Sequence, residues 1–129
     1  MVFAQHVTFR SREGYPLQLE GVLHWPAGRG EERPGAILCH PHPLYGGSME
    51  VPLVVAMAEE LAQRGIVALR FNFRGVGHSQ GTYAGGEGEM ADAAGALDFL
   101  ESQAKVDREK LYLVGYSFGA GVGLRYVES

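Results

Sequence analysis

The residues best suited to chemistry form the pentapeptide GYSFG at 115–119. It has the pattern Gly-x-Ser-x-Gly, which is short enough to arise by chance when it stands alone. Its surroundings make it more specific, because a continuous apolar run at 111–114 precedes it and small residues follow it at 120, 121 and 123. A strand, a sharp turn and a helix are the setting in which this pattern exposes a nucleophilic serine.

The spacing of the pentapeptide has a physical reason. A serine on a strained turn projects its hydroxyl above the sheet, and the residues two before and two after it come too close to backbone to carry side chains. Gly115 and Gly119 meet that requirement. The backbone N–H of Phe118 then lies at a helix N-terminus and can donate to an oxyanion. The alternative is that Ser117 only caps a glycine-flanked helix.

A second polar segment is HPHPLYGGS at residues 40–48. In a hydrolase with such a turn, the loop after an earlier buried strand supplies the second oxyanion N–H. Proline has no N–H, so His42 and Leu44 are the candidate backbone donors, with a slight preference for Leu44. Imidazole is also a metal ligand, but no further ligand cluster lies near His40 and His42 in the sequence. We therefore expect no metal, and expect both imidazoles to hydrogen-bond within the loop.

The glycine-rich segment GVGHSQG at 75–81 is superficially similar to a dinucleotide-binding fingerprint. The third required glycine position holds Gln80, and no Walker lysine follows, so no cofactor is predicted. We expect Arg74 to anchor this loop by donating to backbone carbonyls. His78 is a weak candidate for a general base, because it lies well before Ser117 in a wide turn.

The elements that must position these loops alternate along the chain. Apolar patterns predict strands at 7–10, 17–24, 36–39, 66–71 and 111–114, and helices at 51–64, 87–103 and from 118 onward. This order predicts a single α/β domain over residues 1–129. Its sheet is mostly parallel, with an N-terminal antiparallel hairpin and helices on both faces.

Composition narrows the classes of protein. The 129 residues are 46% hydrophobic and carry a net charge of −4 with mixed signs, so no nucleic-acid partner is expected. The longest apolar run, 51–58, is too short to cross a membrane. The single cysteine, Cys39, fits a reducing compartment, and the first residues do not have the pattern of a secretory signal. We therefore expect a cytoplasmic protein.

Three segments occur together and in order: HPHPLYGG at 40–47, NFRGVGHSQG at 72–81 and GYSFG at 115–119. Together they resemble the small, lidless, dienelactone-hydrolase-like bacterial α/β-hydrolases, over nearly the whole chain. The resemblance implies an eight-stranded sheet whose second strand is antiparallel, and a Ser–Asp–His triad in that chain order. It also implies that Ser117 is the nucleophile and Phe118 an oxyanion donor, and that Gly115 and Gly119 are the elbow glycines. The expected partner is a small-molecule acyl substrate, with no cofactor.

The chain departs from that family pattern after the serine. Only residues 118–129 follow it, and they contain neither the Asp nor the His of a triad. Asp92, Asp98 and Asp107 all precede Ser117 and are expected to be surface or helix-end charges.

We therefore expect an α/β-hydrolase fold truncated after the nucleophile elbow, and a 129-residue chain that is inactive on its own. Its strand at 111–114 is then an exposed apolar edge that favours self-association. The alternative to a hydrolase is a non-catalytic binding or assembly module built on the same half-sheet.

Overall fold

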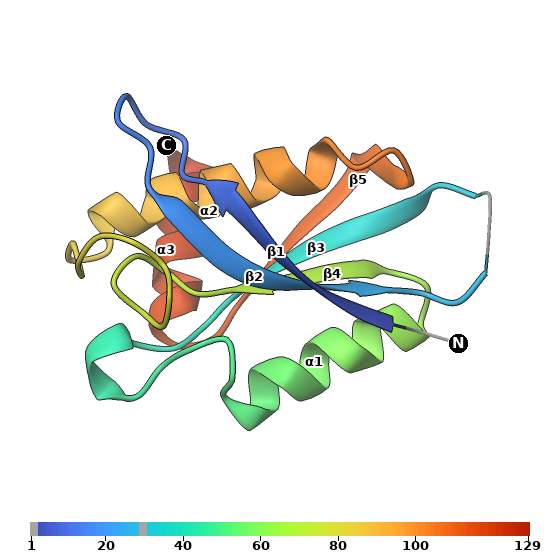
Figure 1. Cartoon of the computed structure of the whole chain (residues 1–129), viewed down its shortest axis with the longest axis horizontal. Coiled ribbons are helices and arrows are strands. Elements are labelled where there is room, and N and C mark those ends of the chain that lie inside the picture. Colours follow the sequence, from blue (N-terminus) through green and yellow to red (C-terminus); the bar gives the residue numbers. More distant parts are fainter. Residues whose placement is uncertain (1–2, 29–30) are drawn as a thin grey trace.

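The computed structural model of the protein describes residues 3–28 and 31–129. Within these ranges five strands form one mixed sheet, and three α-helices pack on it (Figure 1). The strands are β1 (Phe3–Arg10), β2 (Gln18–Trp25), β3 (Arg33–Cys39), β4 (Val67–Phe71) and β5 (Val106–Gly115). The helices are α1 (Pro52–Gln63), α2 (Glu87–Glu101) and α3 (Phe118–Glu128), with a short 3-10 helix η1 (Pro43–Tyr45).

The strand order across the sheet is β1-β2-β4-β3-β5. β1 and β2 form the antiparallel hairpin that the sequence predicted, and β2 also runs antiparallel to β4. β3 is parallel to both of its neighbours, and Leu38 lies opposite Arg70 of β4 and Val114 of β5. The carboxyl ends of β3, β4 and β5 therefore lie side by side at one end of the sheet, and each of the three motif segments begins there.

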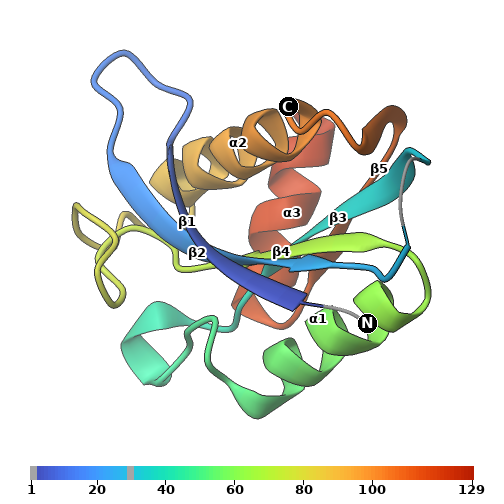
Figure 2. The same ribbon diagram turned by 45° about the vertical axis from the view of Figure 1, so that its right-hand side comes forward.

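Helices cover both faces of the sheet, as predicted. Figures 1 and 2 show α1 on one face and α2 with α3 on the other. Each face of the sheet has its own hydrophobic core, and successive residues of β3 point into alternate ones. Ile37 and Cys39 belong to the core on the α2 side, and Leu38 belongs to the core beneath α1. Burial on both faces explains why this strand is a continuous apolar run rather than an alternating one.

Three strands begin earlier than the sequence predicted. β5 starts at Val106 instead of Leu111, β1 at Phe3 instead of Val7, and β3 at Arg33 instead of Ala36. β1 and β5 are the outer strands of the sheet that the described residues form. Residues 107–110 of β5 are all charged, and those at 108–110 are exposed, so this segment carries no apolar pattern by which to recognise the strand.

The expectation that Asp92 is a surface charge is wrong. Its side chain is fully buried on α2 and accepts hydrogen bonds from Arg74: from the backbone N–H at 2.9 Å and from Nη2 at 2.8 Å. Arg74 Nη2 also lies 2.7 Å from a Glu13 carboxylate oxygen. The anchors of Arg74 are thus carboxylates rather than the backbone carbonyls we expected. A charge can stay buried here because it is paired and hydrogen-bonded.

Asp98, in contrast, is a surface charge, paired with Arg12 at 2.7 Å. The Asp107 carboxylate accepts from the backbone N–H of Glu109 at 3.0 Å. No helix within residues 3–28 and 31–129 is long and apolar enough to cross a bilayer.

Candidate functional site

Ser117 occupies the turn between β5 and α3 with φ 56° and ψ −116°. It is the only non-glycine residue with positive φ in the described part of the chain. This conformation costs on the order of 1–3 kcal/mol for a residue with a side chain, and it persists only where the surrounding structure enforces it. The strained strand-to-helix turn predicted from the sequence is therefore present.

Close packing around the turn explains its two glycines. A Cβ atom at Gly119 would lie 2.0 Å from the carbonyl oxygen of Cys39, and one at Gly115 would lie 2.5 Å from Cα of Ala120. The backbone N–H of Tyr116 donates to the same Cys39 carbonyl at 3.1 Å. The turn is thus held directly against the end of β3, next to the loop at 40–48.

Two backbone N–H groups beside this turn are available to a ligand. Those of Phe118 and His42 donate to no acceptor among the described residues. The N–H of Leu44, in contrast, already donates to Nδ1 of the His42 side chain at 3.1 Å. This geometry favours His42 over Leu44 as the second oxyanion donor.

The His42 imidazole joins the loop at 40–48 to the elbow. Its ring centroid lies 4.7 Å from that of Phe118 and 5.0 Å from that of Tyr83. Because Nδ1 accepts from Leu44, the neutral ring carries its hydrogen on Nε2 and donates it to the Tyr83 hydroxyl, 3.2 Å away. Tyr83 follows a glycine-rich loop and belongs to no recognisable motif, so the sequence patterns did not single it out.

The His40 imidazole is fully buried behind the loop. Its Nδ1 lies 2.7 Å from the Pro41 carbonyl oxygen, and its Nε2 accepts from the backbone N–H of Phe73 at 3.1 Å. Burial lowers the pKa of His40 to about 4. The expected hydrogen bond within the loop is present, and a second bond reaches the segment after β4.

His78 is directed toward β2 rather than toward the elbow. Its backbone N–H donates to Glu20 at 2.7 Å, and its exposed imidazole lies 3.7 Å from the same carboxylate. Burial alone would raise the pKa of Glu20, but the hydrogen bonds from His78 and from the Asn72 amide outweigh it, so the pKa is lowered. The described contacts of His78 are with Glu20 and not with Ser117. They give no support to His78 as the base.

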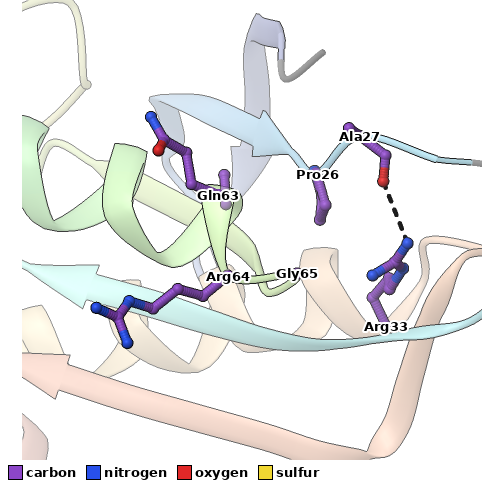
Figure 3. Close-up of a pocket in the computed structure, with 7 residues that line it drawn as sticks. Pro26, Ala27, Arg33, Gln63, Arg64 and Gly65 are labelled. Carbon is purple, nitrogen blue, oxygen red and sulfur yellow. Dashed lines mark hydrogen bonds between the residues drawn. The ribbon is translucent and has the colours of Figure 1, made fainter.

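A pocket of about 590 Å³ lies at the opposite end of the parallel strands (Figure 3). It is an open depression lined by residues from the end of β2, the start of β3 and the last turn of α1, where Arg33 donates to the carbonyl of Ala27 at 3.1 Å. A smaller pocket of about 270 Å³ lies beside the elbow and is lined in part by Tyr83 and Phe118. Among the described residues, no group of three or more His, Cys, Asp or Glu side chains is arranged to hold a metal.

Comparison with known proteins gives consistent matches. Residues 37–129 match the family model described as alpha/beta hydrolase fold. The chain is 43% identical over 94 residues to the uncharacterized protein RP471 of Rickettsia prowazekii. The matched residues make up 73% of this chain and 39% of that protein.

Two solved structures are similar over nearly the whole chain. One is a protein of unknown function, ATU1826, from Agrobacterium tumefaciens, with a TM-score of 0.83 and 39% identity over 96% of this chain and 54% of that one. The other is XC6422 from Xanthomonas campestris, a serine hydrolase without a lid, with a TM-score of 0.78 and 33% identity over 96% of this chain and 56% of that one. The chain spans about half the length of these two structures and less of the curated relative.

Proposed function

Because this chain belongs to the α/β-hydrolase family, we propose that it supplies the nucleophile and the oxyanion hole of a serine hydrolase. The observation that carries the proposal is the conformation of Ser117, whose φ of 56° places a side chain in a region that disfavours one. A helix cap has no need of such strain. A nucleophile does, because the strain lifts its hydroxyl clear of the backbone.

In the proposed reaction, Ser117 Oγ attacks the carbonyl carbon of an ester, and its proton passes to a histidine base. The negative charge on the carbonyl oxygen is stabilised by the N–H groups of Phe118 and His42. Collapse of the tetrahedral intermediate expels the alcohol, which takes the proton from the histidine. Water, activated by the same base, then releases the carboxylic acid and restores the serine.

The histidine base and its aspartate are not among the described groups around Ser117. His40 is fully buried, with both ring nitrogens engaged, and His42 is held by Leu44 and Tyr83. We propose that both triad partners follow residue 129, as the chain order Ser–Asp–His requires.

The substrate we propose is a small carboxylic ester. The loop at 40–48 presents two apolar side chains to solvent, with Leu44 64% and Tyr45 85% exposed. Such side chains suit contact with an apolar acyl or alcohol group.

A fluorophosphonate probe tests the proposal on the protein as its gene encodes it. An activated serine forms a covalent phosphonyl adduct, so we expect peptide mass spectrometry to find the adduct on Ser117. Ser48, in the neighbouring loop, serves as the internal control and is expected to stay unmodified. A binding module without a nucleophile would give no adduct on either serine.

We also propose that the 129-residue polypeptide associates with a second copy through β5. This strand pairs only with β3 among the described strands, and Tyr112 at its centre is 54% exposed. Unpaired backbone groups on an apolar edge invite strand addition. Light scattering is expected to give a mass above that of a monomer, and Tyr112→Lys to lower it, whereas Tyr15→Lys in the exposed hairpin turn leaves it unchanged. A monodisperse monomer at high concentration contradicts the proposal.

A further inference from the structure

The proposed oxyanion donor of the loop is part of one rigid peptide unit. The N–H of His42 and the carbonyl of Pro41 belong to the same planar amide. The described residues contain no cis peptide bond, so these two groups point in opposite directions. Any group that fixes the Pro41 carbonyl therefore also fixes the direction of the His42 N–H.

The His40 side chain contacts that carbonyl, with Nδ1 2.7 Å from the Pro41 oxygen. The hydrogen bond at Nε2, the other ring nitrogen of His40, shows which of the two nitrogens carries the imidazole hydrogen. Nε2 faces the backbone N–H of Phe73 at 3.1 Å, and an N–H can only donate, so Nε2 is unprotonated. The hydrogen of the neutral imidazole is thus on Nδ1, where it donates to Pro41.

We propose that His40 is a positioning residue that aims the His42 N–H at the oxyanion formed at Ser117. It acts through the Pro41 carbonyl and does not touch the substrate. The inference rests on the proposed function, because it assumes that the His42 N–H is an oxyanion donor. The bond accepted by the carbonyl also polarises the amide and strengthens its N–H as a donor.

The surroundings of His40 make the arrangement rigid. The imidazole is fully buried, and its ring lies edge-on to Phe73 with centroids 4.8 Å apart. Phe73 in turn packs edge-on against Phe118, at 5.8 Å. One aromatic residue therefore supports both halves of the proposed oxyanion hole, and burial, which lowers the pKa of His40 to about 4, keeps the imidazole neutral at ordinary pH.

Two substitutions of His40 separate its two hydrogen bonds. In His40→Asn the side-chain amide nitrogen takes the place of Nδ1 and keeps the donor to Pro41. In His40→Gln the amide oxygen takes the place of Nε2 and keeps the acceptor for Phe73. Both variants lose part of the packing of the imidazole, so each is the stability control for the other.

Ester hydrolysis by the protein as its gene encodes it is the first measurement. We expect His40→Gln to lower kcat about 10- to 100-fold with little change in KM, because a misaimed donor loses transition-state stabilisation. We expect His40→Asn to keep kcat within a few-fold of the wild type. Equal losses in the two variants, or wild-type kcat in His40→Gln, would overturn the proposal.

The amide ¹⁵N resonance of His42 gives a readout independent of activity. A hydrogen bond accepted by the Pro41 carbonyl deshields this nitrogen, so its resonance is expected to move upfield in His40→Gln and to stay in place in His40→Asn. Identical resonances in the two variants would overturn the role of His40. If hydrolysis survives Ser117→Ala, the proposed function fails, and the resonance still decides whether His40 orients this peptide.

Discussion

Replacing Ser117 with alanine is expected to lower the turnover of an activated ester such as p-nitrophenyl acetate by about 10⁴- to 10⁶-fold in the protein as its gene encodes it. The loss is large because the substitution removes the hydroxyl of the proposed nucleophile, and with it the covalent intermediate. Alanine tolerates the strained φ of 56° no better and no worse than serine, so the far-UV circular dichroism and the melting temperature are expected to change little. Ser48→Ala is the matched control and should retain full turnover.

The 129-residue polypeptide alone is expected to show almost no turnover. None of its histidines follows Ser117, and a serine without a base is a poor nucleophile. Robust activity of this polypeptide that is lost on mutation of His42 or His78 would place the base within it and contradict the proposed chain order.

Replacing Asp92 with alanine is expected to lower the free energy of unfolding by about 3–5 kcal/mol, because it leaves the guanidinium of Arg74 buried and without its main partner. The Asp92 carboxylate accepts hydrogen bonds from the backbone N–H, from Nε and from Nη2 of Arg74, and the Arg74 side chain is only 10% exposed. Urea denaturation monitored by circular dichroism measures the loss.

Asp98→Ala is the matched control, on the same helix and also paired with an arginine. The Asp98 side chain is 51% exposed and that of Arg12 53%, so its removal is expected to cost at most about 1 kcal/mol. The double variant Arg74→Met/Asp92→Leu should recover part of the stability lost in Asp92→Ala, because it removes both charges together. Equal losses in the two single variants would show that burial of the Arg74–Asp92 pair has no energetic consequence.

The features that were predictable from sequence depend on local chemistry. The turn at Ser117 was predictable because its glycines are required by atoms only a few residues away, or by the strand end against which the turn packs. β3 was predictable because burial on both faces leaves an uninterrupted apolar run at 36–39, and β4 because its apolar run is interrupted only by Arg70. In each case a short stretch of sequence carries the signal, although the atom that excludes a side chain at Gly119 is the carbonyl oxygen of Cys39.

The features that were missed depend on partners distant in the sequence. Asp92 was misplaced because its partner, Arg74, lies on a different loop, and an isolated aspartate on a helix resembles any surface charge. The slight preference for Leu44 over His42 stays a prediction, and the hydrogen bond that weighs against it comes from a side-chain nitrogen only two residues away. His40 and Tyr83 gained their roles only once the segment after β4 had been placed beside the loop at 40–48.

The strand order also makes the carboxyl ends of β3 and β5 a topological switch point. From β3 the chain leaves toward α1 on one face, and from the adjacent β5 it leaves toward α3 on the other. Two neighbouring connections that diverge in this way open a crevice between them, which is where open α/β sheets bind their ligands. The location of the proposed site, between Ser117 and the loop at 40–48, is thus set by the winding of the backbone. The exposed side chains of that loop, such as Leu44 and Tyr45, are free to vary with the ligand without disturbing the sheet.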